Sequence, residues 1–547
     1  MRYVSMRTLS FLGVAAAVVA VSLPASASAD SSQWGGSPAR NNAPETGSLP
    51  AEWNIGGFDR RTGDWLPDDA ENILWVARLG SQTYGTPVIA GGRIFVATNN
   101  GAGYVRRYPA EVDLGCLLCF RQEDGRFGWQ LSREKLAAGR AVDWPDQGIC
   151  CSPLVEGDRV WIVTNRGEVV CLDADGFYNN RNTDPYRDEP SEDLREADIV
   201  WIFDMIGQLG VHPHNMSSCS VTAAGDLLLV NTSDGVDESH DTIPSPDAPS
   251  FIALDKHTGE LVWADNSPGT NLLHGQWCSP AFAVLGDVPQ AIFAAGDGWV
   301  YSFRAERTAD GKPELLWKFD CNPKTARWGG GGMGDRNNII ATPVIYEGLV
   351  YIATGQDPEH GEGPAILWCI DPTKRGDVSP ELVFDRDGNP VPPRRVQNCD
   401  PEAGETTRPN PNSAAVWQYA GADVEGDRAF EETMHRTLSL AAIHDGLLVI
   451  PDLAGLIHCV DAKTGKLHWT YDTLAAIWGS PLIADGKVYI GDEDGVVTVF
   501  RLSPELEVLA KNNMADSIYS APVAVGNIIY ISTRRYLVAI GDAGDSE

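Results

Sequence analysis

The amino-acid sequence predicts an all-β protein, an eight-bladed β-propeller made of four-stranded antiparallel blades. The main evidence is an internal repeat, whose clearest copy runs from Ser480 to Val499. A second observation is that many copies close on a tight turn followed by Trp, as in Asp461 to Trp469. One four-stranded sheet cannot bury both of its faces, so repeats of this kind stack face to face, and a closed ring protects their edges. Internal repetition therefore indicates the architecture before any local motif does.

Each copy contains four short strands in a constant order. A Ser-Pro or Thr-Pro phrase opens the innermost strand, and turns containing Gly lead to the second, third and outermost strands, the last of which carries Trp. The eight copies begin near Tyr84, Cys150, Ser218, Trp277, Ile340, Thr437, Trp478 and Ser520. The closing Trp residues, which we expect to pack between adjacent blades, are Trp129, Trp201, Trp263, Trp317, Trp417 and Trp469.

The two ends of the chain supply the two parts of one blade. The eighth copy stops after Ile540 without a Trp strand, whereas residues 72–77, which contain Trp75, form a Trp strand that precedes the first copy. We expect this N-terminal strand to complete the last blade and close the ring. A seven-bladed ring with frayed ends is the alternative, because the copies at Ser220 and Ser439 lack Pro.

The first 29 residues have the organisation of an export signal. Arg2 and Arg7 precede an apolar run from Leu9 to Leu23, and an Ala-x-Ala sequence ends at Ala29. This order is typical of a signal peptide that is cleaved after Ala29, and its apolar core is short for a membrane span. We therefore predict a periplasmic or secreted protein. Its expected parts are a signal peptide at 1–29, an N-terminal extension at 30–71 and one propeller at 72–547.

The chain is strongly acidic. Over all 547 residues the formal net charge is −33 at pH 7. Such a charge repels nucleic acid and anionic lipid head groups, so neither is an expected partner. Two interpretations stay open: the acidic groups attract cations or basic partners, or they only keep an exported protein soluble. No apolar stretch after the export signal reaches membrane length, so we expect no membrane span.

Insertions interrupt the repeat and mark the places where function can sit, because loops on a rigid scaffold usually carry binding groups. The main insertions are residues 177–199, 234–250, 321–338 and 372–435. Just before the first of them, Asp173-Ala174-Asp175-Gly176 resembles part of a calcium loop. The twelve-residue pattern of such a loop is incomplete there, and a blade needs a turn at this place in any case.

The repeat sorts most of the eleven cysteines into two positions. One position lies in the third strand, where we expect small buried residues; its members are Cys119, Cys171, Cys369, Cys459, Ala253 and Ala539. The other lies directly before the opening Ser, at one mouth of the central channel; its members are Cys151, Cys219 and Cys278. Cys150 and Cys151 are adjacent, and a disulfide between neighbours needs a strained ring of a kind found at functional sites.

Histidines lie close to the openings of the third and fourth blades. His214 precedes Cys219, and His274 precedes Cys278. If the blade openings converge at one mouth, these four side chains approach each other and form a transition-metal site, since imidazole and thiolate bind such ions. The alternative is that the histidines cap loops and bond to the backbone.

The Gly-x-Val-Tyr-Ile strand and the Asp-x-x-Thr-Gly-x-x-x-Trp close resemble the pyrroloquinoline quinone (PQQ)-like propeller repeat, over essentially the whole mature chain. One branch of that family contains PQQ-dependent alcohol dehydrogenases, which are eight-bladed quinoproteins with calcium. Another contains non-catalytic propellers such as the assembly factor B of the outer-membrane protein insertion machinery. The resemblance to the first branch implies that Cys150 and Cys151 pack on one face of the quinone and that Trp328 stacks on it.

The resemblance to the enzymes breaks at two places. The family follows its cysteine pair with Asn-Arg-Gly, where this chain has Ser152-Pro153-Leu154, and the phrase that ends at Trp277 lacks the catalytic carboxylate. Without a base and a metal that polarises the quinone, the known mechanism lacks its central parts. We therefore expect a non-catalytic binding or scaffolding module with a protein partner or a small ligand at the propeller mouth. The alternative is a PQQ-dependent oxidoreductase with a modified site that binds PQQ and calcium.

Overall fold

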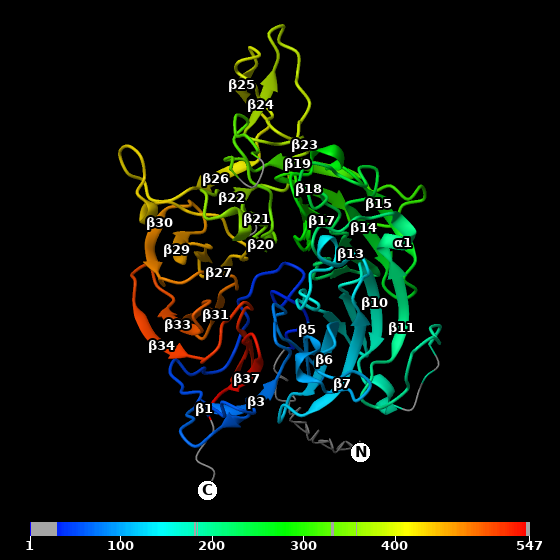
Figure 1. Cartoon of the computed structure of the whole chain (residues 1–547). Helices are drawn as coiled ribbons and strands as arrows, with labels where there is room; N and C mark the ends of the chain where they lie inside the picture. The colour runs from blue at the N-terminus through cyan, green and yellow to red at the C-terminus, as the bar shows by residue number, and fades with distance from the viewer. Residues whose placement is uncertain (2–29, 180–181, 183, 330–332, 357, 543–547) are drawn as a thin grey trace.

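Eight four-stranded blades form a ring in the computed structural model of the chain (Figure 1). The structure describes residues 1, 30–179, 182, 184–329, 333–356 and 358–542. The predicted signal peptide, apart from Met1, therefore lies outside the described residues. The predicted fold class is confirmed, and the seven-bladed alternative is wrong.

Every blade pairs its strands in antiparallel order from the channel outward. Blades 1 and 2 are β4 (Val88–Ala90), β5 (Arg93–Asn99), β6 (Leu114–Arg121) and β7 (Phe127–Glu134), then β8 (Leu154–Glu156), β9 (Arg159–Val163), β10 (Glu168–Asp173) and β11 (Ile199–Asp204). Blades 3 and 4 are β12 (Thr222–Ala224), β13 (Leu227–Asn231), β14 (Phe251–Asp255) and β15 (Leu261–Asp265), then β16 (Ala281–Leu285), β17 (Val288–Ala294), β18 (Trp299–Arg304) and β19 (Leu315–Asp320).

The second half of the ring continues in the same way, except that its last blade takes a strand from the N-terminus. Blades 5 and 6 are β20 (Val344–Tyr346), β21 (Leu349–Ala353), β22 (Leu367–Ile370) and β26 (Ala415–Tyr419), then β27 (Ala442–His444), β28 (Leu447–Pro451), β29 (Leu456–Asp461) and β30 (Leu467–Asp472). Blades 7 and 8 are β31 (Leu482–Ala484), β32 (Lys487–Gly491), β33 (Val496–Arg501) and β34 (Val508–Asn513), then β35 (Val523–Val525), β36 (Ile528–Ser532), β37 (Tyr536–Ile540) and β3 (Ile73–Arg78).

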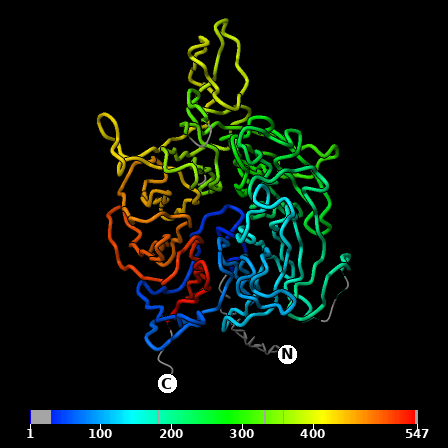
Figure 2. The backbone as a smooth tube through the Cα atoms, in the orientation of Figure 1, coloured from blue at the N-terminus to red at the C-terminus, as the bar shows by residue number. Residues whose placement is uncertain are grey.

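The ring is closed by the N-terminal strand, as predicted. Strand β3 pairs antiparallel with β37, and Trp75 lies opposite Ala539. In Figure 2 the blue N-terminal chain and the red C-terminal chain lie side by side at this blade. A short hairpin, β1 (Gly57–Phe58) with β2 (Trp65–Leu66), precedes the closing strand.

Each of the seven repeat Trp residues lies on an outermost strand, and the register places six of them opposite a small residue of the third strand. The pairs are Trp75 with Ala539, Trp201 with Cys171, Trp263 with Ala253, Trp317 with Ser302, Trp417 with Cys369 and Trp469 with Cys459. The indole reaches the turn of the next blade, since Trp129 Nε1 donates to Ala174 O at 3.1 Å. A Cβ at Gly176 would lie 2.9 Å from that ring. A glycine in this turn lets neighbouring blades pack closely.

The opening Ser and Thr residues join the innermost strands of neighbouring blades. The backbone N–H of Thr86 donates to Ser152 Oγ at 3.0 Å, and that of Ser152 donates to Ser220 Oγ at 2.9 Å. The same bond recurs between the next blades, from Ser220 to Ser279 and from Ser279 to Thr342. Hydroxyl residues open the repeat because they satisfy backbone donors around the channel.

The N-terminal extension closes one end of the channel. Ser31 O accepts from Ile89 N at 2.9 Å in blade 1, and Asn42 O accepts from Ile483 N at 3.0 Å in blade 7. Between them the fully buried Arg40 guanidinium donates to Pro280 O at 2.9 Å and to Val221 O at 3.1 Å. In Figure 2 this dark-blue segment enters the centre of the ring.

The longest insertion extends the ring outward. Residues 372–435 include β23 (Gly376–Asp377), which extends blade 4, and the hairpin of β24 (Glu381–Phe384) with β25 (Thr406–Pro409). This hairpin projects from the top of the ring in Figure 1. The α-helix of the described chain, α1 (Met205–Leu209), is short, and none of the described helices is long and apolar enough to cross a membrane.

Candidate metal centre at the channel mouth

The end of the channel opposite to the N-terminal extension opens into an apolar chamber of about 340 Å³. The N-terminal extension forms hydrogen bonds with residues that stand three positions after the opening Ser or Thr of a blade, such as Ile89 after Thr86. The chamber is lined by residues that stand two positions before the same Ser or Thr, such as Tyr84. Because the innermost strands run along the channel, these two levels face opposite ends. Six chamber-lining residues stand at this level, namely Tyr84, Cys150, Ser218, Trp277, Ile340 and Trp478, and Leu438 lies one position before Ser439 in the sixth blade.

Four aromatic side chains line this chamber, namely Tyr84, Trp144, Trp277 and Trp478. Tyr84 packs against Trp478 at 5.9 Å and against Tyr519 at 5.2 Å between ring centroids. Trp277 lines another part of the wall. Among the described lining residues, Glu359 carries the one ionisable group other than the Tyr84 and Cys150 side chains, so the chamber suits a largely apolar ligand.

A cluster of four histidines lies beside Trp277. His214 and His274 come from the loops that enter β12 and β16, His240 from the β13–β14 loop and His360 from the β21–β22 loop. The ring of His274 lies 4.2 Å from His214, 4.7 Å from His240 and 4.6 Å from His360, between centroids. One ligand nitrogen each from His214, His240 and His274 lies within 4.8 Å of the other two.

The buried half of the cluster is held in place by backbone contacts. His214 is fully buried and His274 is 1% exposed. His214 Nδ1 lies 2.7 Å from Val236 O, and an N–H there donates to this carbonyl, which directs Nε2 into the cluster. A Cβ at Gly235 would lie 2.8 Å from His214 Cβ, so glycine is needed for this close approach. Trp277 Nε1 donates to Met216 O at 3.1 Å and fixes the adjacent wall.

His240 is positioned by a strained loop and by a distant insertion. Its backbone has φ 65, a left-handed value that is uncommon outside glycine and that often occurs at functional sites. Arg395, which lies in the 372–435 insertion, donates to His240 O at 3.0 Å and to Asp241 O at 2.6 Å. Two insertions that are far apart in sequence therefore meet over the cluster.

His360 and Trp328 complete the outer side of the cluster. Arg436 is 2% exposed and donates to His360 O at 2.5 Å and to Asn337 Oδ1 at 2.8 Å. The Trp328 indole lies 6.0 Å from the His360 ring, and its backbone N–H donates to Val396 O. His240 and His360 are both partly exposed, so an ion can reach the cluster from this side.

The structure brings together some of the predicted site residues and separates others. His214 and His274 meet, and sequence reasoning missed His240, whose position within an insertion is its one signal. Cys219 and Cys278 instead bond to backbone groups: Cys219 Sγ accepts from Asn231 N at 3.3 Å within blade 3, and Cys278 Sγ donates to Ala341 O of the next blade at 3.0 Å. Burial raises the pKa of both thiols to about 12.

The predicted cofactor residues are also spread over two places. Cys150 and Cys151 are free thiols; Cys150 lines the chamber, and Cys151 Sγ donates to Val163 O at 3.1 Å. Burial raises the pKa of the Cys150 thiol to about 12. Trp328 belongs to the histidine cluster and not to the described chamber wall.

Comparisons with known proteins support a PQQ-like propeller family for the chain. Residues 409–505 match the family described as outer membrane protein assembly factor BamB. Polyvinylalcohol dehydrogenase of Sphingopyxis sp. (strain 113P3) is 37% identical over 117 residues, which are 20% of this chain and 16% of that protein. The chain thus matches about a sixth of the length of this curated relative.

A solved structure shares the fold at low sequence identity. A europium-containing methanol dehydrogenase aligns with a TM-score of 0.57 and 11% identity over 94% of this chain and 98% of its own. BamB from Moraxella catarrhalis aligns with a TM-score of 0.45 and 13% identity over 86% of this chain and 98% of its own.

Proposed function

We propose that this PQQ-like propeller is an exported binding protein that holds a transition-metal ion on His214, His240 and His274. The observation that carries the proposal is the convergence of three imidazole nitrogens within 4.8 Å of one another. These side chains come from loops of neighbouring blades, so the ring itself brings them together. The bound ion lies beside the chamber, which accepts a small, largely apolar ligand.

The ligand set suits Zn²⁺ or Cu²⁺. Neutral imidazole binds both ions, and the cluster contributes no thiolate or carboxylate among the described residues. Zn–N bonds of about 2.0–2.1 Å in a tetrahedral site place two ligands of one ion about 3.3–3.4 Å apart. The three imidazole nitrogens lie within 4.8 Å of one another, so side-chain rotation that closes them onto one ion completes the coordination shell. Three protein ligands leave a further coordination position for water, for His360 or for a bound molecule.

The chamber does not suit PQQ with calcium. PQQ carries three carboxylates, and the described chamber wall contains no Lys or Arg to pair with them. Its acidic side chain, Glu359, has the same sign of charge as the cofactor. The two cysteines also face different surroundings, because Cys150 lines the chamber whereas Cys151 Sγ donates to Val163 O within blade 2. These features support a binding role over the quinoprotein alternative.

The test is a metal titration of the full mature chain. We expect isothermal calorimetry to give one equivalent of Zn²⁺ bound with a Kd of micromolar or tighter. The Cu²⁺-loaded protein is expected to show nitrogen hyperfine splitting in its EPR spectrum. His240→Ala should weaken Zn²⁺ at least tenfold without loss of fold, because His240 lies in a partly exposed insertion loop. His257→Ala is the matched control, since His257 is exposed and pairs with Asp226 elsewhere on the ring.

Two results would contradict the proposal. One is unchanged Zn²⁺ affinity in the His240→Ala variant. The other is saturable binding of PQQ and calcium at micromolar concentration that is lost in a Cys150→Ser, Cys151→Ser double variant, which would favour the oxidoreductase.

A further inference from the structure

A second cluster of possible metal ligands lies on the outer part of blade 2, away from the histidines. Asp173 is the last residue of β10, and Asp198 directly precedes β11, so these two residues are the ends of the connection that contains the 177–199 insertion. Asp184 lies within the insertion itself. One carboxylate oxygen from each of these three residues lies within 4.8 Å of the other two.

Asp198 is the residue that makes this cluster more than a group of acidic side chains. It is fully buried, and neither of its carboxylate oxygens has a hydrogen-bond partner among the described residues. A buried carboxylate without partners is costly, and native proteins usually pair such a group with a cation or a donor. The carboxylate of Asp198 is directed toward Asp173 and Asp184, which share its sign of charge. Burial, followed by the neighbouring Asp184 and Asp173, raises the pKa of Asp198 to about 7.

The protein's own cations satisfy this cluster only in part. Arg159 lies 3.1 Å from Asp173 Oδ2 and 3.6 Å from Asp184 Oδ1, and it also contacts Asp158 at 3.4 Å. One guanidinium thus contacts three carboxylates, of which only Asp173 and Asp184 belong to the cluster. When ionised, the three carboxylates of the cluster less this one guanidinium leave a formal charge of −2, which a divalent cation balances.

We propose that Asp173, Asp184 and Asp198 bind a calcium ion that fastens the 177–199 insertion to the edge of blade 2. Ca²⁺ takes oxygen ligands at about 2.3–2.6 Å, so any two ligands of one ion lie at most about 5.2 Å apart, and three oxygens that lie within 4.8 Å of one another meet this limit. Mg²⁺ requires bonds of about 2.0–2.1 Å and a tighter octahedron. The side chain of Asn179, whose amide contacts Asp173 Oδ2 at 3.0 Å, offers a further oxygen after rotation of the amide.

The ion would act at the two ends of the connection. The backbone already joins them, since Asp173 N donates to Asp198 O at 3.0 Å. Carboxylates from both ends and from the insertion on one ion would restrict the insertion further. This site is independent of the histidine cluster, because hard oxygen ligands favour Ca²⁺ and imidazoles favour Zn²⁺ or Cu²⁺.

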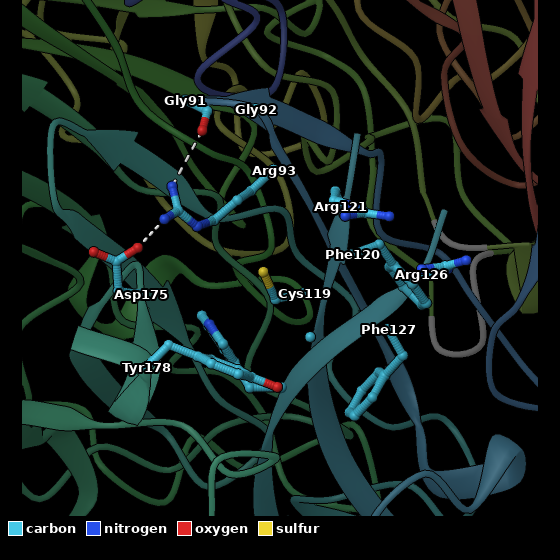
Figure 3. Close-up of a pocket in the computed structure, with 12 residues that line it drawn as sticks. Gly91, Gly92, Arg93, Cys119, Phe120, Arg121, Arg126, Phe127, Asp175 and Tyr178 are labelled. Carbon is cyan, nitrogen blue, oxygen red and sulfur yellow. Dashed lines mark hydrogen bonds and ion pairs between the residues drawn. The ribbon is translucent and has the colours of Figure 1, made fainter. Parts of the chain in front are cut away.

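Asp175 provides a matched control in the same turn. Figure 3 shows its carboxylate paired with Arg93 of the neighbouring blade, and Arg93 also donates to Gly91 O at 3.1 Å. Tyr178 lines the same groove between the two blades. Asp175→Asn therefore changes one charge beside the proposed site without removing one of its three carboxylates.

The experiment measures Ca²⁺ by calorimetry on chelator-treated full mature protein and follows tryptic cleavage after the exposed Arg187. We expect one equivalent of Ca²⁺ bound at micromolar Kd and at least tenfold slower cleavage with Ca²⁺. Asp198→Asn should raise the Kd at least tenfold and abolish the protection, while its thermal stability in chelator stays equal to or above that of the wild type. Asp175→Asn and His240→Ala should retain both effects.

Three outcomes would overturn the assignment. The first is wild-type protein without a calcium-dependent change in either measurement. The second is an Asp198→Asn variant with wild-type Ca²⁺ affinity. The third is equal binding of Mg²⁺ at the same concentration.

Discussion

Replacing Trp129 and Trp263 by Phe should have clearly different effects, although the two residues occupy equivalent positions in blades 1 and 3. Both are essentially buried, at 1% and 0% exposure. Trp129 Nε1 donates to Ala174 O, whereas Trp263 Nε1 has no hydrogen-bond partner among the described residues. The comparison therefore isolates one hydrogen bond between blades.

The magnitudes follow from area and hydrogen bonding. Trp→Phe removes roughly 50 Å² of buried apolar surface, which costs about 1.3 kcal/mol at about 25 cal/mol per Å². In Trp129→Phe the buried Ala174 carbonyl also loses its donor, which adds about 1–3 kcal/mol. In Trp263→Phe an unsatisfied buried N–H disappears, which offsets the lost area by a similar amount. We expect Trp129→Phe to lower the free energy of unfolding by about 2–4 kcal/mol and Trp263→Phe to change it by less than about 1 kcal/mol.

Denaturant unfolding followed by tryptophan fluorescence and circular dichroism gives the comparison. Trp129→Ala and Trp263→Ala serve as controls, since both should cost about 3–5 kcal/mol through the cavity they leave. Equal losses in the two Phe variants would show that the bond to Ala174 does not contribute, and the reasoning would be refuted.

Three further predictions concern closure, pH and the metal centre. Deletion of residues 30–78 removes β3 and the segment that closes the channel, so the melting temperature should fall sharply; a truncated protein that melts like the full mature chain would contradict this. Burial raises the pKa of Asp297 to about 6, so the stabilisation by its protonated form is present below about pH 4 and is lost as pH rises through about 6. Relative to Asp297→Asn, the wild type should lose about 3 kcal/mol of unfolding free energy between pH 4 and pH 8. Parallel profiles of unfolding free energy against pH in the two proteins would exclude this contribution. Arg395→Ala should weaken Zn²⁺ binding about 10-fold or more because Arg395 holds the His240 loop, whereas Arg386→Ala, in the same insertion, should leave the Zn²⁺ affinity unchanged.

The ring was predictable because its determinants are local and repeated. Each copy carries its own turns, its Trp and the small residue opposite it, as Trp469 and Cys459 show. The closing strand was found because the last copy lacked one element and residues 72–77 supplied it. These features recur in the same order in each blade, so the structure expected for one copy applies to the others.

The candidate sites were only partly predictable because insertions have no equivalent in the repeat. His214 and His274 stand at blade openings and were recognised from that position. His240 reaches them through a left-handed backbone and through Arg395, which lies 155 residues further along the chain. Asp173 was visible as part of a turn, but the burial of Asp198 beside it depends on how the connection folds back to β11.

The two proposed sites share one construction, which bears on the acidity of the chain. In the histidine site, His214 and His274 stand on loops that enter blade strands, and His240 comes from an insertion. In the carboxylate site, Asp173 and Asp198 stand at the end of one blade strand and just before the next, and Asp184 comes from an insertion. An insertion adds negative charge and chain entropy without adding core, so it is the least stable part of a ring. A cation bound between blade and insertion neutralises part of the negative charge and restricts the conformations of the insertion. With the proposed calcium ion in place, part of the net charge of −33 would serve to hold one insertion and would not only form a solubilising surface.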